Sequence, residues 1–274
     1  MGNYYDEDYY IEDYYEEQPR DSNIDGAKSL ILKELFEGDP ENVFYGRQIQ
    51  VLFEDKYFHW ITEKAIKELV AEGTIKYEKM ILKNKVSIRF YMTKSNRYWK
   101  RRAEKKRKLI AQFSTTDFGK ALGHHSEILF DSALARHGFM PTETNVNEYK
   151  GKRWTETGHD LDRIYERDGI AYGAELKNTL SYIDRDELEI KLAMCKALDL
   201  KPLFIMRMAP KSYIWEYVAK EGGFSLIFKY QLYPYGFENL AREVKRELSL
   251  PVDCPRVIQS GTIERFLRWH SQNM

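Results

Sequence analysis

Hydrophobic positions near the start of the chain recur at helical spacing in three short segments. Apolar residues follow this spacing over 27–36 and 45–53, and a third stripe over 60–70 stops at Gly73. Spacing of three to four residues places side chains on one face of a helix, and glycine commonly ends helices. The pattern predicts three short helices in this region.

A period of two follows the third stripe. Residues 74–82 are strand-like, 83–85 form a turn pattern, and the apolar residues of 86–92 alternate with Ser, Arg and Tyr. Three helices closed by a hairpin resemble a winged helix-turn-helix domain, and this resemblance rests on the order and spacing of the elements. We therefore expect a small winged-helix domain over residues 23–94.

The remainder of the chain alternates between helical and strand patterns. These patterns predict, in order, a helix over 123–137, strands up to 177, a helix over 184–198, a strand over 202–206, a helix over 212–220, a strand over 224–230, and helices over 238–248 and 262–270. Such alternation is typical of an α/β fold. We expect one α/β domain over residues 114–274.

The formal net charge is zero, but the charges are separated along the chain. Residues 1–22 are mostly Tyr, Asp and Glu, with eight acidic residues against one arginine, so they have little to bury. Residues 97–108 carry eight basic residues against one acidic residue, a density that favours contact with nucleic-acid phosphate over a merely solvated helix face. We expect a disordered acidic tail over 1–22 and a basic helical connector over 95–113.

Composition narrows the class of protein. The sequence has no run of about 18 apolar residues and no apolar leader pattern, so we expect a cytoplasmic protein that has no membrane partner. Cys195 and Cys254 are the only cysteines, and neither has a Cys or His at metal-ligand spacing. This excludes a disulfide framework and a zinc ribbon.

A second hairpin pattern carries the candidate chemistry. Asp168-Gly169 separates two strand-like segments, 160–167 and 170–177, and Asp-Gly is a favoured two-residue loop of the type I′ turn. If these two residues form the loop, the numbers of opposed residues sum to 337. This register places Asp162 opposite Glu175.

The same register brings three carboxylates and one lysine onto one face of the hairpin. Asp160 lies opposite Lys177, and side chains alternate with a period of two, so Asp160, Asp162, Glu175 and Lys177 project together. Carboxylates directly opposed across two strands repel unless a cation lies between them. Two carboxylates and a lysine supply what metal-assisted phosphodiester hydrolysis needs.

An ordinary explanation of the hairpin is a solvated face with a salt bridge between Asp160 and Lys177. The triplet Glu-x-Lys by itself has little value, because the chain contains six of them. Only the triplet that begins at Glu175 lies late in a predicted strand with an Asp opposite. The position of this triplet in the predicted hairpin, rather than the Glu-x-Lys pattern itself, therefore favours a functional site.

These residues resemble the PD-(D/E)XK nuclease superfamily, the fold of many restriction enzymes and archaeal Holliday-junction resolvases. The resemblance implies a restriction-endonuclease-like core, a central mixed sheet flanked by helices, over about half of the chain. It implies that Asp162, Glu175 and the backbone carbonyl of Leu176 bind metal, and that Lys177 orients water and stabilises charge. It also implies a metal-binding role for Glu127, on the preceding helix, with an ordinary surface glutamate as the alternative.

The match to the family has one departure. Leu161 stands where the family name has proline, a position that varies among members, and Asp160 is an alternative to Asp162 as the metal ligand. Ala171 and Gly173, small residues on the same face as Glu175, are expected to leave room for a DNA backbone.

Basic residues outside the hairpin are candidates for DNA contact. The predicted helix over 60–72 mixes acidic and basic residues, which makes it a poor surface for reading DNA, and a dimerisation or partner-binding module is the alternative role for this domain. We expect phosphate contacts from the wing, the connector and the helix after the hairpin. These candidates are Lys79, Lys83, Lys85, Arg97, Lys100, Arg101, Arg102, Lys105, Lys106 and Lys191.

The sequence thus predicts an endodeoxyribonuclease that depends on magnesium (Mg²⁺) or manganese (Mn²⁺). One such site cuts one strand, so we expect a homodimer for double-strand or junction cleavage. The resemblance leaves the DNA substrate open among a restriction site, a junction, a transposon end and a repair intermediate. The alternative is a non-catalytic DNA-binding or regulatory protein on a nuclease-like scaffold.

Deletion of residues 1–22 tests whether the acidic tail occupies the basic connector. If it does, the shortened chain binds a DNA duplex more tightly than the full chain at low salt, and the difference disappears at high salt because screening weakens the contact. Fluorescence anisotropy with a labelled duplex measures both affinities. Equal affinity at low salt would assign the tail to solubility or to a partner.

Overall fold

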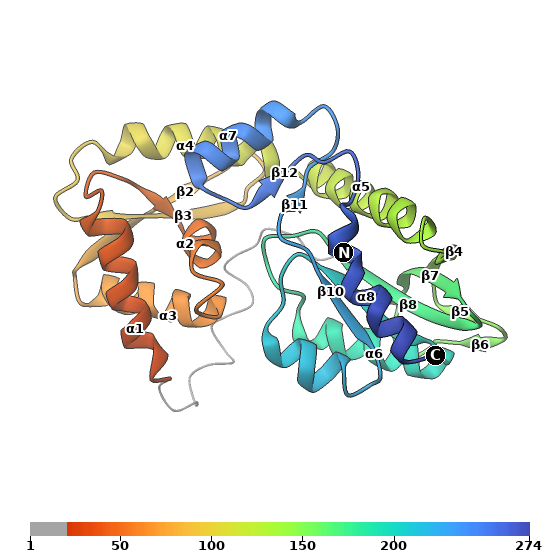
Figure 1. The fold of residues 1–274 in the computed structure, drawn as a ribbon. Helices are drawn as coiled ribbons and strands as arrows, with labels where there is room; N and C mark the ends of the chain where they lie inside the picture. The colour runs from red at the N-terminus through yellow and green to blue at the C-terminus, as the bar shows by residue number, and fades with distance from the viewer. Residues whose placement is uncertain (1–20) are drawn as a thin grey trace. The chain divides into compact units, whose positions relative to one another are not determined.

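The computed structural model describes residues 21–274, which form two compact units (Figure 1). Within this range, the first unit comprises 21–120 and 239–251, and the second comprises 121–238 and 252–274. The expected acidic tail falls outside the described residues except for its last two positions. The chain passes between the units three times, so neither unit is one continuous segment.

The first unit contains the three helices and the hairpin expected over 23–94. Its elements are α1 (Asn23–Ile31), the π-helix Leu32–Glu37 that continues α1, β1 (Phe44–Tyr45), α2 (Gly46–Leu52), α3 (His59–Ala71), β2 (Ile75–Ile81), β3 (Ser87–Thr93), α4 (Trp99–Phe113) and α7 (Glu238–Leu248). The three strands form an antiparallel sheet in the order β1-β3-β2. The short strand β1 was not expected from the sequence, because two residues show no period.

The core of the first unit lies between its helices and its sheet. Ile24 and Ile31 of α1 and Ile66 of α3 are almost fully buried, together with Ile75 of β2 and Tyr91 of β3. The i, i+7 spacing of the two isoleucines in α1 places them on one side of that helix, as the hydrophobic pattern predicts. Burial of this apolar face is what holds the three helices against the hairpin.

Helix α4, expected as a basic connector, is packed into the first unit. Its side chains Ala103, Ile110 and Phe113 are buried, at helical spacing that gives α4 one apolar face. Lys105 forms an ion pair of 2.6 Å with Glu247 of α7. Helix α7 therefore groups with the first unit, whereas the sequence pattern placed it in the second domain.

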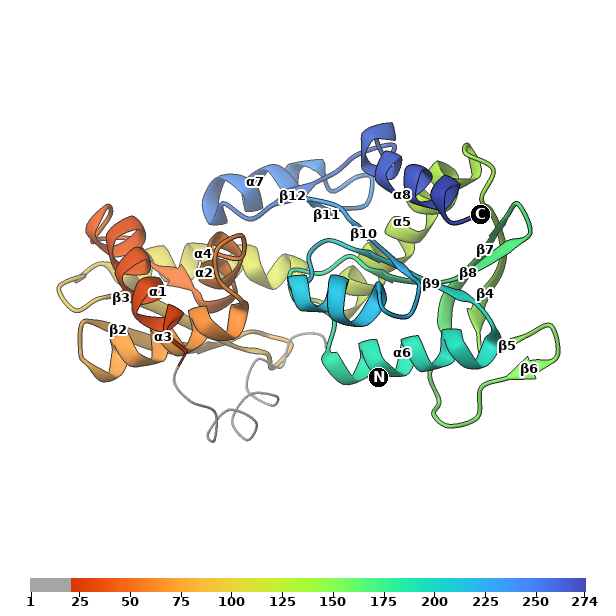
Figure 2. The same cartoon turned by 60° about the horizontal axis from the view of Figure 1, so that its bottom comes forward.

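The second unit is a mixed α/β structure with a central sheet flanked by helices (Figures 1 and 2). Its elements are α5 (Thr116–Ala135, which begins in the first unit), β4 (Met140–Val146), β5 (Glu148–Tyr149), β6 (Lys152–Arg153), β7 (Leu161–Arg167), β8 (Ile170–Lys177), α6 (Arg185–Leu198), β9 (Lys201–Met206), the π-helix Tyr213–Val218, β10 (Phe224–Ile227), β11 (Gln231–Leu232), β12 (Val252–Asp253) and α8 (Ser260–Gln272). The five main strands have the order β10-β9-β8-β7-β4. Strands β8, β9 and β10 are parallel, and β4, β7 and β8 are antiparallel.

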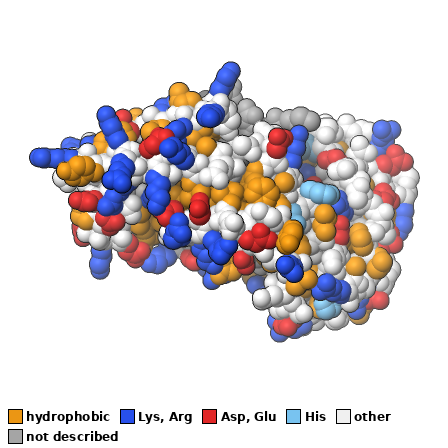
Figure 3. All heavy atoms as spheres, turned by 90° about the horizontal axis from the view of Figure 1, so that it is seen from above, with side chains coloured by type: hydrophobic (Ala, Val, Ile, Leu, Met, Phe, Trp, Pro, Cys, Tyr) orange, Lys and Arg blue, Asp and Glu red, His pale blue; other side chains and the backbone are white. Residues whose placement is uncertain are grey.

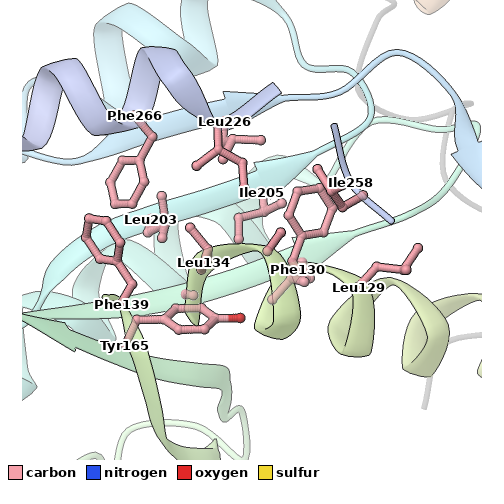
Figure 4. Close-up of a cluster of buried hydrophobic side chains, with 14 of the residues drawn as sticks. Leu129, Phe130, Leu134, Phe139, Tyr165, Leu203, Ile205, Leu226, Ile258 and Phe266 are labelled. Carbon is pink, nitrogen blue, oxygen red and sulfur yellow. The ribbon is translucent and has the colours of Figure 1, made fainter. Parts of the chain in front are cut away.

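Helices cover both faces of this sheet. On one face, Phe130 of α5 and Phe266 of α8 pack with Leu203 and Ile205 of β9 (Figure 4). On the other face, Cys195 of α6 lies among the side chains of β7. Within residues 21–274, no helix is long and apolar enough to cross a membrane.

Helix α6 lies directly against the hairpin of β7 and β8. A β-carbon added at Gly173 would come within 2.8 Å of both the Sγ atom of Cys195 and a methyl carbon of Leu161. The absence of a side chain at Gly173 thus lets α6 approach the sheet. The expectation that this glycine leaves room for a DNA backbone is wrong, because α6 fills that space.

Substitution of Gly173 by alanine is expected to lower the free energy of unfolding by about 1–3 kcal/mol, since the new methyl group overpacks the contact with α6. Chemical denaturation monitored by circular dichroism measures this loss. Gly158→Ala is the matched control, because nothing lies within 4 Å of a β-carbon there. Equal stability of the two variants would contradict the close approach of α6.

Candidate functional site

The hairpin of β7 and β8 has the register that its sequence predicts. The loop residues Asp168-Gly169 have φ angles of 52° and 76°, the left-handed values that a type I′ turn requires at both positions. Pairing runs from Arg167 with Ile170 to Arg163 with Ala174, and each pair sums to the expected 337. Asp162 and Glu175 are therefore the next opposed positions.

The Asp162 carboxylate is turned into the hairpin. Its Oδ2 atom accepts a hydrogen bond of 2.6 Å from the backbone N–H of Leu176. Burial, together with the neighbouring negative charge of Glu175, raises the pKa of Asp162 to about 7. Asp160, the alternative ligand, has an exposed side chain. The structure thus distinguishes the two aspartates by their surroundings.

Glu175 is enclosed and paired with two lysines. Only 1% of this residue is exposed. The Oε1 atom lies 2.8 Å from Nζ of Lys177, and Oε2 forms an ion pair with Nζ of Lys191. A carboxylate that is shielded from solvent needs such partners, because an unpaired buried charge is strongly unfavourable.

Lys191 has a different place from the one expected. Only 4% of this residue is exposed, and its ammonium group donates to the backbone carbonyl of Asp160 as well as to Glu175. Its sequence-based assignment was a contact with DNA phosphate at the protein surface. In this structure Lys191 is instead an internal component of the site.

Lys177 has a second acidic partner that the sequence did not single out. Its Nζ atom lies 2.7 Å from Oε1 of Glu187, in the first turn of α6. Acidic residues are common in the first turns of helices because they complement the helix dipole. Nothing in the sequence therefore marked Glu187 as a residue of the site. Its contact with Lys177 follows from the close approach of α6 to the sheet.

Glu127 is held by an arginine rather than directed at the two carboxylates. Its Oε2 atom lies 2.7 Å from Nη2 of Arg163, whose Nε atom lies 3.2 Å from Oδ2 of Asp131. The hydroxyl of Tyr165 also donates to Asp131, at 2.6 Å. Glu127 and Asp131 are four residues apart on α5, a spacing that could have indicated a shared partner.

Asn178 fixes the chain directly after Lys177. Its side-chain amide donates to the backbone carbonyls of Leu122 and Leu232, and its side-chain oxygen accepts from the N–H of Leu232 at 2.7 Å. A buried amide with all of these groups satisfied restricts the local backbone. The position of Lys177 at the end of β8 is thereby held.

The donor set is compatible with a magnesium ion. Within residues 21–274, no three His, Cys, Asp or Glu side chains converge on a point where they could hold a metal. The site offers two carboxylates, Asp162 and Glu175, and Mg²⁺ in proteins is commonly bound by one or two carboxylates with water completing its coordination. Glu127 would have to leave Arg163 to contribute.

Basic residues of the first unit differ in how far their side chains are exposed. Three residues of the β2–β3 hairpin have exposed side chains, and so do three residues before and at the start of α4. These residues are Lys79, Lys83, Lys85, Arg97, Lys100 and Arg101. Figure 3 shows Lys and Arg side chains on one face of the molecule, interspersed with acidic and apolar ones.

Three other residues expected to contact DNA already have protein partners. Lys106 is buried, its ammonium group donates to the carbonyl of Val43, and burial lowers its pKa to about 8. Arg102 lies 3.1 Å from Glu41, and Lys105 is paired with Glu247 of α7. The structure therefore accounts for these three charges without DNA.

Comparisons of the chain with protein-family models, with curated proteins and with solved structures gave no match.

The raised pKa of Asp162 predicts a pH-dependent stability. The folded chain keeps the Asp162 proton up to about pH 7, whereas an unfolded aspartate loses it near pH 4. The free energy of unfolding therefore falls as the pH rises from about 4 to about 7. Asp162→Asn removes this loss and is expected to be more stable than the wild type at pH 8, by about 4 kcal/mol, since each pH unit between 4 and 7 costs about 1.4 kcal/mol.

Thermal melts of the metal-free protein at pH 5 and pH 8 measure this effect. The advantage of Asp162→Asn is expected to be largest at pH 8 and to shrink at pH 5, where the wild-type carboxyl group is protonated. Asp160→Asn is the control, because that side chain is exposed. Identical pH profiles for Asp162→Asn and the wild type would contradict the burial of the Asp162 charge.

Proposed function

We propose that the chain is a metal-dependent endodeoxyribonuclease, with its active site at the end of the β7–β8 hairpin. The observation that carries the proposal is the placement of Asp162 and Glu175 at opposed positions of β7 and β8, with Nζ of Lys177 2.8 Å from Oε1 of Glu175. Two carboxylates and a lysine form the set expected for hydrolysis of a phosphodiester with Mg²⁺ or Mn²⁺.

The order of the elements supports the proposal of a PD-(D/E)XK core. That family has an Asp on one strand, Glu-x-Lys on the next, a Glu from the preceding helix and a Lys or Gln from the following helix. In this chain, the corresponding positions are Asp162 on β7, Glu175 and Lys177 on β8, Glu127 on α5 and Lys191 on α6. Lys191 reaches Glu175, as a lysine of the following helix would in such a site.

Each residue has a role that follows from its position. Asp162 and Glu175 would hold the metal ion with the carbonyl of Leu176, and the bound ion would act as a Lewis acid toward the scissile phosphate. Lys177, on the same face as Glu175, would orient the attacking water and offset negative charge on the phosphate. Asp162, rather than the exposed Asp160, is assigned as the ligand because its carboxylate is fixed by the N–H of Leu176.

DNA binding is assigned to the first unit, as a winged-helix domain. Its exposed basic residues on the wing and at the start of α4 would contact phosphate, which gives affinity that falls with salt and reads little sequence. Helix α3 supports this assignment poorly as a reading helix, because Glu68 on it and Glu72 directly after it are acidic and pair with Lys28. One site cuts one strand, so double-strand cleavage would use a second copy of the chain.

A non-catalytic DNA-binding protein is the second candidate, and a specific observation favours it. Both oxygens of Glu175 are paired with lysines, and Glu127 is paired with Arg163. A protein that retained the nuclease fold only as a scaffold could keep these ion pairs permanently, since they stabilise buried charges. Such a protein would bind DNA and leave it intact.

Nicking of supercoiled plasmid with Mg²⁺ separates the two candidates. The wild type is expected to nick, and Lys177→Ala and Asp162→Asn are expected to lose at least about a hundredfold in rate while DNA binding is nearly unchanged. Glu243→Gln is the control, because Glu243 begins another Glu-x-Lys triplet and is exposed. Wild-type rates in Lys177→Ala would refute the assignment.

The same assay with linear, nicked, forked and four-way DNA identifies the substrate class. A protein that binds these DNAs and cleaves none of them would be the non-catalytic candidate.

A further inference from the structure

The ammonium group of Lys191 occupies a position with the chemistry of a cation site. Its two partners are a carboxylate oxygen of Glu175 and the backbone carbonyl oxygen of Asp160. Carboxylate and carbonyl oxygens are also the ligands that Mg²⁺ and other hard divalent cations take. Lys191 and Glu175 are both almost completely buried, so their contact excludes water.

The charges around Glu175 are nearly balanced without a metal ion. Three carboxylates, those of Asp162, Glu175 and Glu187, lie with the ammonium groups of Lys177 and Lys191. The two lysines offset the negative charges of Glu175 and Glu187, and Asp162 adds a third negative charge when it is ionised. A divalent ion that joined this group would leave an excess of positive charge in a poorly solvated place, where charges interact strongly.

We propose that Lys191 competes with the divalent metal ion for Glu175 and keeps the metal affinity of the DNA-free protein low. The metal site itself rests on the proposed function, and the inference adds how that site is regulated. When nucleic acid binds, its phosphate supplies the negative charge that offsets the metal. Metal and nucleic acid then bind cooperatively, and linkage requires each to tighten the other by the same factor.

A purely structural ion pair makes the opposite prediction. If Lys191 only stabilises the fold, its replacement weakens the fold and leaves metal affinity unchanged or lower. If Lys191 competes with the metal, removal of its charge makes metal binding tighter. Metal affinity therefore distinguishes the two roles, whereas loss of stability alone does not.

Titration of the full chain with Mn²⁺, followed by electron paramagnetic resonance at pH 8, measures metal affinity without catalysis. Lys191→Gln keeps a side chain that can donate to Asp160 and Glu175 but removes the charge, and it is expected to bind Mn²⁺ at least about tenfold more tightly than the wild type. Lys191→Arg, which keeps the charge, is expected to bind as weakly as the wild type. Lys196→Gln, at an exposed position on α6, is the matched control.

A second titration includes a short phosphorothioate DNA duplex, which resists cleavage. The duplex is expected to tighten Mn²⁺ binding by the wild type at least about tenfold and to have a smaller effect on Lys191→Gln. Thermal melts establish that each variant is folded. If Lys191→Gln does not fold, the wild-type titration with and without the duplex decides, and unchanged Mn²⁺ affinity overturns the proposal.

The outcomes separate this inference from the proposed function. Mn²⁺ binding that is lost in Asp162→Asn but is not tightened in folded Lys191→Gln overturns the competition and leaves the metal site standing. If neither the wild type nor Lys191→Gln binds Mn²⁺, with or without the duplex, both the competition by Lys191 and the proposed metal site are overturned.

Discussion

The burial of the Glu175 carboxylate is the constraint on which the candidate site depends. A charge enclosed in a protein interior must be paired, and the partners of Glu175 come from two places: Lys177 on its own strand and Lys191 on α6. The second lysine can reach only because α6 lies close to the sheet, and that approach requires a residue without a side chain at Gly173. The electrostatic pairing of Glu175 therefore depends on the close packing of α6 against the sheet.

Much of the fold could be predicted from the sequence because its signals are local. The left-handed φ angles needed at Asp168 and Gly169 select an Asp-Gly loop, and the loop fixes the register of both strands. The helices over 23–71 followed from apolar spacing in the same way. Two features could not be predicted from the sequence. Two-residue strands such as β1 show no period, and the amphipathic pattern of α7 does not indicate which unit its apolar face packs against.

The site shows the same division between local and tertiary information. Asp162 and Glu175 are neighbours because they oppose each other across one hairpin. The partners of Glu127 and Lys191 could not be predicted, because Arg163 and Glu175 meet them only after α5 and α6 pack on the sheet. The sequence also predicted more exposed basic residues than the structure has, because burial depends on tertiary packing. Lys106 is one of the eight basic residues of 97–108, but the fold buries it against the carbonyl of Val43.

The three passages of the chain between the two units limit how they can be separated. Cleavage after residue 120 would leave α7 on the fragment that contains the second unit, although α7 belongs to the first unit. The buried apolar side chains Leu240, Val244 and Leu248 of α7 would then become exposed. An exposed face of that kind promotes aggregation. Exchange by recombination at a single joint would likewise divide at least one of the two units, because each of them is built from two separate segments of the chain.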